Sequence, residues 1–135
     1  MILESFSKIN LSLNINKKLK KNRLHDIQSY FCLINLCDQK KIKKIKSQKD
    51  KIRFQGRFAK YIKKKNSITD ILTILRERNL ISNYYSVLVN KKIPVFAGLG
   101  GGTSNAVCLV KHLIKGKINK IIRKRVNIFI FLITG

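Results

Sequence analysis

The sequence predicts a mixed α+β domain. Its first half contains several segments with strand character. Its second half contains two segments with helical periodicity, separated by one more strand and a glycine-rich loop. Strands and helices that are segregated along a chain are typical of α+β folds. The 135 residues are enough for one domain with a single core.

The first two strands are predicted near the N-terminus. Residues 9–15 alternate apolar and polar side chains, which indicates a strand with one buried face. Residues 17–23 are basic and predict a loop. Residues 27–36 are richer in β-branched and aromatic side chains and predict the second strand.

A third strand is predicted after a lysine-rich stretch. Residues 39–51 predict a solvated hairpin in which Ile42 and Ile45 make only weak apolar contacts. Residues 52–58 then predict the returning strand.

Two helices and a strand are predicted in the second half. Ser67 and Asp70 fit an N-terminal capping pattern, and apolar residues recur at helical spacing to about residue 80. The preceding Asn66 is interpreted as part of the helix cap. Residues 84–89 predict a strand, and residues 105–114 predict the second helix.

The charge of the chain is extreme, because 30 basic residues face 6 acidic ones and give a formal net charge of +24. Such a surface suits a nucleic acid or an acidic membrane. The alternative is compositional drift in an A+T-rich genome, since Lys, Ile and Asn are enriched together. Lysines are spread from Lys8 to Lys124 with few aromatic residues between them, which favours drift.

Cysteine usage and hydropathy indicate a cytoplasmic protein. Cys32, Cys37 and Cys108 form no C-x-x-C pair and have no histidine at metal-ligand spacing, which predicts thiols in a reducing compartment. The N-terminus lacks the basic and apolar regions of a signal peptide. The longest apolar run, residues 128–133, is far shorter than the ~20 residues of a membrane span. We therefore expect no membrane partner.

The most specific feature is residues 94–106, which read PVFAGLGGGTSNA. Glycines let backbone N–H groups approach a polyanion closely, and a following helix directs the positive end of its dipole to the same place. Hydroxyls at Thr103 and Ser104 suit phosphate oxygens or a magnesium ion. No Gly-Lys-Ser/Thr follows, as in a Walker loop, and no dinucleotide-binding G-x-G-x-x-G opens the helix with an acidic residue downstream. The segment predicts a different kind of phosphate-binding loop.

This loop resembles the P-x-x-x-G-L-G-[SG]-[SG]-S-[SN]-A motif of the GHMP small-molecule kinases. Thr103 stands where the family usually has serine, which preserves the hydroxyl. The resemblance implies ATP and Mg²⁺ as cofactors, with Ser104 as a candidate magnesium ligand. It also implies a fold like the second domain of ribosomal protein S5, with a mixed sheet and helices on one face. The implied ATP-binding residues are Pro94, Ala97, Gly98, Leu99, Gly100, Gly101, Gly102, Thr103 and Ser104.

A second matching segment is residues 7–13, SKINLSL, which resemble the family's opening A-K-I-N-L-x-L strand. In the family the lysine lies beside the reacting hydroxyl and the asparagine holds the substrate. The resemblance therefore implies a catalytic role for Lys8 and substrate binding by Asn10. A lysine in a closed site stabilises charge on transferring phosphoryl oxygens. The alternative for Lys8 alone is a solvated side chain.

A third matching segment is residues 24–29, LHDIQS, which resemble the family's G-Y-H-E-L-Q-[ST] segment. The resemblance implies that His25 contacts the cytosine ring of a cytidine-diphosphate-linked polyol. It also implies that the enzyme transfers a phosphoryl group from ATP to this polyol in isoprenoid biosynthesis. The alternative is an exposed loop histidine. Leu24 replaces the family's tyrosine, so part of the aromatic platform for cytidine is missing.

The C-terminal part departs from the family pattern. Family members carry a catalytic aspartate in a later G-[AS]-D-[VI]-P-F motif, whereas this sequence has no Asp or Glu after Glu77. Asn127 or Arg125 falls near that position, depending on the alignment, and neither can act as a carboxylate base. Family members also continue into a second domain. We therefore divide the chain into an ATP-binding domain at residues 1–125 and a degenerate or truncated tail at 126–135, and we expect a fragment with little or no kinase activity alone.

Two other interpretations stay open. A basic RNA-binding module with an S5-like fold would explain the net charge, and its affinity would fall steeply with salt. The glycine-rich loop favours the kinase over this alternative. A remnant that never folds would show no cooperative thermal transition.

Overall fold

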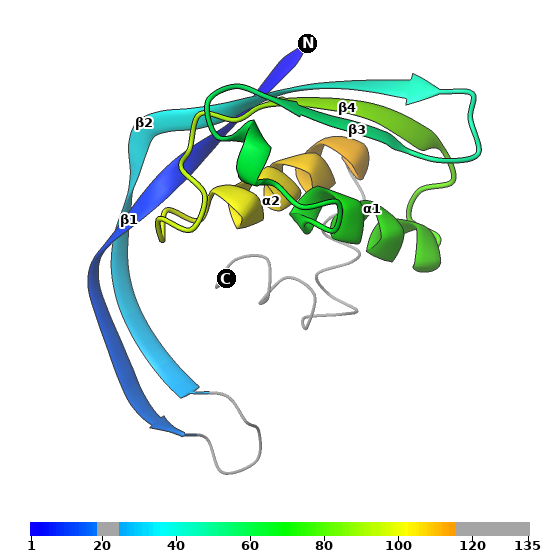
Figure 1. Ribbon diagram of the computed structural model, residues 1–135. Coiled ribbons are helices and arrows are strands. Elements are labelled where there is room, and N and C mark those ends of the chain that lie inside the picture. The colour runs from blue at the N-terminus through cyan, green and yellow to red at the C-terminus, as the bar shows by residue number, and fades with distance from the viewer. Residues whose placement is uncertain (19–24, 116–135) are drawn as a thin grey trace.

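The fold is a four-stranded mixed sheet with α1 and α2 on one side of it (Figure 1). The computed structural model describes residues 1–18 and 25–115. The strands lie in the order β1-β2-β4-β3, with β3 parallel to β4 and the other neighbours antiparallel. The predicted α+β class, with helices on one face, is confirmed. The elements are β1 (Ile2–Lys18), β2 (His25–Ile45), β3 (Lys51–Gln55), the short 3-10 helix η1 (Ala59–Tyr61), α1 (Ser67–Glu77), β4 (Tyr84–Asn90) and α2 (Gly101–Leu113).

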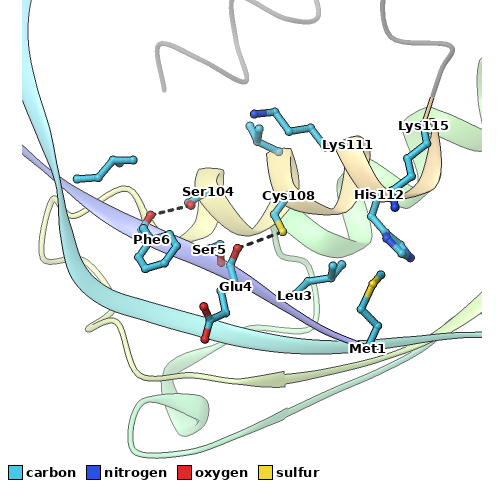
Figure 2. A pocket seen from close by; sticks show the side chains of 12 residues that line it. Met1, Leu3, Glu4, Ser5, Phe6, Ser104, Cys108, Lys111, His112 and Lys115 are labelled. Carbon is cyan, nitrogen blue, oxygen red and sulfur yellow. Dashed lines mark hydrogen bonds between the residues drawn. The ribbon is translucent and has the colours of Figure 1, made fainter.

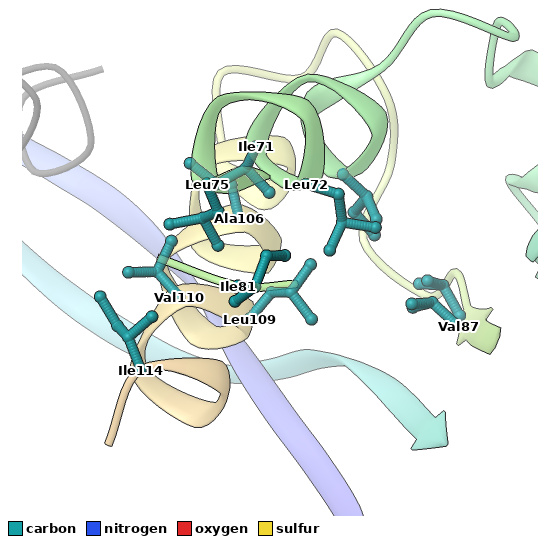
Figure 3. Packing of buried hydrophobic residues seen from close by; sticks show 11 residues of the cluster. Ile71, Leu72, Leu75, Ile81, Val87, Ala106, Leu109, Val110 and Ile114 are labelled. Atoms are coloured by element: carbon teal, nitrogen blue, oxygen red, sulfur yellow. The ribbon is translucent and has the colours of Figure 1, made fainter. Parts of the chain in front are cut away.

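The core lies between the two helices and the helix-facing side of the sheet (Figure 3). Both helices bury one apolar stripe, as their periodicity predicts. From the sheet, β4 contributes Val87 and Val89, which are almost completely buried. The buried apolar side chains of the helices are Ile68, Ile71, Leu72 and Leu75 of α1 and Ala106, Leu109 and Val110 of α2.

The predicted solvated hairpin at residues 39–51 is wrong, because β2 continues through most of it to Ile45 and pairs with β4. Side chains alternate between the two faces of a strand. Lys41 is therefore exposed on the outer face, whereas Lys40 is fully buried on the helix side and Ile42 packs against the core. Lysine content alone misled the prediction, since a lysine of a strand can lie on the buried face, as Lys40 does.

The strand predicted at residues 52–58 is shifted to Lys51–Gln55, and it lies parallel to β4 at the sheet edge instead of returning beside β2. Asp50 fixes the preceding bend. Its carboxylate accepts hydrogen bonds from the backbone N–H of Tyr85 at 2.8 Å and from Arg76 Nη2 at 3.0 Å. The connection from β2 to β3 thus crosses the end of β4, which lies between these two strands in the sheet.

The capping box of α1 is formed by Asn66 and Thr69, one residue earlier than the predicted pair Ser67 and Asp70. The side chain of Asn66 accepts from two backbone N–H groups in the first turn, and Thr69 Oγ1 accepts from the Asn66 N–H at 2.9 Å. The interpretation of Asn66 as a cap is confirmed. The helix ends earlier than predicted, and the backbone turns left-handed (φ 56°) at Asn79.

β1 and β2 extend past the helices as a two-stranded arm, which bends toward the side of the sheet that carries the helices (Figure 1). The basic loop predicted at residues 17–23 begins inside β1, and residues 19–24 lie outside the described part. In residues 1–18 and 25–115, no helix is both long and apolar enough to cross a membrane. The arm exposes several large apolar side chains, namely Leu11, Leu13, Ile15, Ile27, Tyr30, Phe31 and Leu33.

Candidate nucleotide-binding site

The glycine-rich loop follows β4 and leads into α2, which begins at Gly101, four residues before the predicted start. Phe96, Gly98 and Gly100 have left-handed φ angles of 64°, 71° and 66°. Glycine adopts this conformation without steric strain. A Cβ added at Gly98 would meet no heavy atom within 4 Å, and the residue is exposed. The loop backbone at Gly98 is therefore open to an approaching ligand.

The N-terminus of α2 has no side chain that caps it. Gly100 is the N-cap residue, and the first turn contains no acidic residue. The first N–H groups of a helix lack intrahelical partners and carry partial positive charge, which suits an anion. The start of α1 lies beside them, since a Cβ added at Gly102 would be 3.4 Å from Ser67 Oγ. The loop and both helix starts thus meet at one place.

β1 holds the loop and brings Lys8 to it. The Lys8 N–H donates to the Leu99 carbonyl at 3.1 Å, and Ser104 Oγ donates to the Phe6 carbonyl at 2.8 Å. The aliphatic part of the Lys8 side chain covers Gly100, where an added Cβ would lie 3.3 Å from Lys8 Cε. Lys8 and the glycine-rich loop, which are distant in sequence, are therefore neighbours.

Asn10 lies on the same face of β1 as Lys8, two residues further along the strand. Their partners across the β1–β2 ladder are Phe31 and Leu33, respectively. Asn10 is exposed, and the Lys8 ammonium lies 5.7 Å from the centroid of the Phe31 ring. The two implied substrate-facing residues thus share one side of the arm where it leaves the core.

The other implied site residues are not gathered at the loop. His25 begins β2 opposite Lys18, at the far end of the arm (Figure 1). Asn127 and Arg125 lie outside the described residues. The Ser104 hydroxyl donates its hydrogen to the Phe6 carbonyl of β1. The lone pairs of its oxygen stay available to a metal ion. Within the described ranges, no three His, Cys, Asp or Glu side chains gather as a metal-binding group.

A buried carboxylate, Asp38 of β2, lies beneath the loop. Its Oδ1 accepts from the backbone N–H groups of Lys92 and Ile93, both at 2.8 Å. Its Oδ2 accepts from Lys91 Nζ at 2.6 Å and from Asn105 Nδ2 at 2.7 Å. All four partners belong to the segments immediately before and after the loop, and Asp38 is fully buried.

A second lysine extends this network. Lys40, also fully buried, donates to Ser5 Oγ at 2.6 Å and to Asn105 Oδ1 at 2.9 Å. Burial lowers the pKa of the Lys40 ammonium, and the neighbouring Cys108 and Asp38 oppose this change. The network therefore combines two lysines with one carboxylate in the interior.

Sequence reasoning missed Asp38 and Lys91. The available signal was an acidic residue directly after an apolar strand segment, in a chain with only 6 acidic residues. Lys91 gave no signal, because it is one of 30 basic residues. Asn105 lies in the loop motif, but the motif by itself predicts no role for its side chain.

A hollow of about 390 Å³ lies between the start of β1 and α2 (Figure 2). It reaches the loop region only through Phe6 and Ser104. His112 lines it, and among the described residues its buried Nδ1 has no hydrogen-bond partner. Burial lowers the pKa of His112, and Lys115 acts in the same direction. The walls are mostly apolar, and among residues 1–18 and 25–115 no hydrogen bond joins a carboxylate or a thiol to His112.

No family model matches the chain, but it is similar to curated proteins and to solved structures. A 4-diphosphocytidyl-2-C-methyl-D-erythritol kinase of Pelagibacter ubique is 41% identical over 120 residues, which are 88% of this chain and 42% of the relative. The enzyme of the same name from Ureaplasma parvum is 33% identical over 116 residues, 85% of this chain and 44% of the relative. The chain thus spans less than half the length of these curated relatives.

Solved structures agree on the fold. The crystal structure of 4-(cytidine 5'-diphospho)-2C-methyl-D-erythritol kinase matches with a TM-score of 0.60 and 24% identity, over 85% of this chain and 41% of that one. Homoserine kinase from Cytophaga hutchinsonii matches with a TM-score of 0.51 and 17% identity, over 86% of this chain and 36% of that one. The resemblance to the GHMP kinases is confirmed: the chain is a homologue of the N-terminal portion of 4-diphosphocytidyl-2-C-methyl-D-erythritol kinases.

Proposed function

We propose that this chain is the nucleotide-binding part of an ATP-dependent kinase of isoprenoid biosynthesis. The reaction would transfer the γ-phosphoryl group of ATP to the 2-hydroxyl of 4-diphosphocytidyl-2-C-methyl-D-erythritol. The observation that carries the proposal is the open glycine-rich loop, which leads into the uncapped start of α2 and lies against Lys8. Relatives with that kinase name support the choice of substrate.

In this proposal the backbone N–H groups of residues 98–104 hold the ATP phosphates. Positioning and electrostatic stabilisation supply most of the catalysis in phosphoryl transfer. Lys8, whose side chain covers Gly100, would stabilise charge on the transferring group, and Asn10, on the same face of β1, would hold the acceptor. Thr103 and Ser104 would offer hydroxyl oxygens to a Mg²⁺ ion bound to the ATP phosphates, and the ion would neutralise charge on those phosphates.

The cytidine end of the substrate would extend along the arm. His25 lies at the far end of the arm and Lys8 near its base, and the arm bends toward the helix side (Figure 1). On β2 the exposed ring of Phe31, opposite Asn10, lies between the levels of the ladder that hold Lys8 and His25. We propose that the substrate lies along this face with its acceptor hydroxyl at Lys8. Lys18, the partner of His25, is ten residues from Lys8, or about 33 Å along an extended strand, so contact of the same substrate with His25 would require the arm to bend further.

The chain by itself should bind ATP but turn over slowly. A positioned carboxylate is the usual group that orients or deprotonates the attacking hydroxyl, and the sequence has none after Glu77. Among the earlier carboxylates, Asp38 and Asp50 already accept several hydrogen bonds on other elements.

Thermal unfolding with and without Mg-ATP tests the binding proposal. A ligand that binds only the folded state adds RT ln(1 + [L]/Kd), or about 2.7 kcal/mol at a hundredfold excess over Kd. We expect a clear rise in Tm with Mg-ATP. A cooperative transition that ignores Mg-ATP would contradict the proposal. Rapid phosphorylation of the cytidine substrate, lost in Lys8→Ala, would contradict slow turnover.

A second candidate function, binding of RNA, is favoured by one observation. The outer face of the sheet presents four exposed cations in two rows. Lys41 and Arg53 flank Leu88 of β4, and Lys43 and Lys51 flank Ser86 of β4. Neutralising these four residues to glutamine should flatten the salt dependence of RNA affinity, because fewer counterions are released. An unchanged slope would exclude this face as an RNA site.

A further inference from the structure

We propose that Asp38 is a positioning residue for the glycine-rich loop, because its single carboxylate bonds to both ends of that loop. The proposal rests on the proposed function only where it predicts nucleotide affinity. The effect on the shape of the loop is independent of any ligand. Asp38 lies in β2 and contacts no part of the loop that would face a phosphate.

One oxygen of Asp38 fixes the start of the loop. Oδ1 accepts from the N–H groups of Lys92 and Ile93, which directly precede Pro94. Proline has no N–H and a restricted φ, so the chain enters the loop in one direction once Ile93 is held. Ile93 is also fully buried, which leaves its backbone no water to bond to instead.

The other oxygen fixes the end of the loop. Oδ2 accepts from Asn105 Nδ2 at 2.7 Å, in the early part of α2. It also accepts from Lys91 Nζ, which in turn donates to the Ile93 carbonyl at 2.8 Å. Lys91 Nζ lies only 3.1 Å from the position of a Cβ added at Gly101. The carboxylate thereby sets the separation between the last residues of the approach to the loop and the first turn of α2.

Burial makes these bonds strong and their loss costly. Asp38, Lys91 and Asn105 are at most 3% exposed. Charge-assisted hydrogen bonds are stronger than neutral ones, and an unpaired charge in the interior is strongly unfavourable. With both ends held, residues 94–104 keep their N–H groups directed at one site before a ligand arrives. Such preorganisation raises affinity because less ordering is lost on binding.

Asp38→Asn is the direct test, because it keeps the shape but replaces one acceptor oxygen by an N–H donor facing Lys91 and Asn105. Hydrogen–deuterium exchange of peptides that cover residues 95–104, without nucleotide, reports on the loop. We expect exchange there to quicken by about tenfold or more, and Mg-ATP affinity to fall by a similar factor. The amides of α1 should keep their wild-type exchange.

Asp50→Asn is the matched control. Asp50 also accepts from a backbone N–H and from a cation, but at the bend before β3 and on Arg76. This variant should leave loop exchange and Mg-ATP affinity unchanged. If Asp50→Asn alters the loop as much as Asp38→Asn, or if folded Asp38→Asn leaves loop exchange unchanged, the proposal is wrong.

Asn105→Ala covers the case in which Asp38→Asn does not fold. It cuts the link from Asp38 to α2 and keeps the bonds to Lys92 and Ile93. We expect faster exchange at the start of α2 than before Pro94, and equal effects at both ends would overturn the proposal. If wild-type protein fails to bind Mg-ATP, the proposed function fails, whereas the exchange data still decide the role of Asp38.

Discussion

Two adjacent glycines at the start of α2 should respond in opposite directions to alanine. A Cβ at Gly101 would lie 2.9 Å from Ile93 Cγ2 and 3.1 Å from Lys91 Nζ, closer than such atoms pack without a shift. Ile93 is fully buried, so it has little room to move. A Cβ at Gly102 would meet only the side chain of Ser67, with Oγ at 3.4 Å and Cβ at 3.9 Å, which are ordinary contacts, and Gly102 is exposed.

The expected magnitudes follow from two opposing effects. Alanine in a helix is more favourable than glycine by up to about 1 kcal/mol, partly because the unfolded chain loses freedom. Overpacking a buried site costs about 1–3 kcal/mol. Gly102→Ala should therefore stabilise the protein by about 0.5 kcal/mol at this first-turn position. Gly101→Ala should destabilise it by about 1–2 kcal/mol after the same gain is subtracted.

Urea unfolding of the two variants and the wild type, followed by far-ultraviolet circular dichroism, measures both values. The slope of unfolding free energy against urea should stay constant, so the midpoint alone reports stability. If Gly101→Ala is as stable as Gly102→Ala, then the start of α2 is not packed against Lys91 and Ile93. That result would also contradict the close approach of Gly101 to Lys91 and Ile93, on which the geometry of the loop depends.

Two further predictions concern Lys40 and Asn66. Burial lowers the pKa of Lys40 in the folded protein below its ordinary value of 10.5. At a pH between these two pKa values the unfolded state binds more protons than the folded state. The free energy of unfolding therefore rises with pH in this range. The wild type should therefore gain stability relative to Lys40→Met as the pH is raised from neutral toward 10.5 in urea titrations, and a constant difference would contradict this. Asn66→Ala removes the side-chain acceptor that caps α1 and should cost about 1 kcal/mol in thermal unfolding. Asn66→Asp keeps an acceptor and should lose much less.

The sequence was sufficient for features that depend on local pattern. The stripe of α1, with Ile68 and Leu72, follows from spacing alone, and the strand predicted at residues 84–89 matches β4 to within one residue. The loop was recognisable because its glycines and hydroxyls occur in a fixed order. These features need no knowledge of distant partners.

Features that depend on distant partners could not be predicted in this way. Lys40 and Lys41 are chemically identical, yet one is fully buried and the other exposed, because only the pairing of β2 with β4 decides which face each occupies. Asp38 gains its importance from Lys91 and Asn105, which are 53 and 67 residues away in the chain. Spacing rules within one helix or strand cannot connect such residues.

The electrostatics beneath the loop lead to a last prediction. The interior network places two lysines against one carboxylate, and Lys91 Nζ lies beside the first residue of α2, whose N-terminus is itself partly positive. Without an anion this accumulation of positive charge is unfavourable, and a phosphate held by the loop would offset it. At equal ionic strength, inorganic phosphate should therefore raise the Tm more than chloride does. Lys91→Met should lose most of this difference, whereas Lys43→Met, on the exposed outer face, should keep it. An equal phosphate effect in all three proteins would assign it to the net charge of +24 instead of the loop.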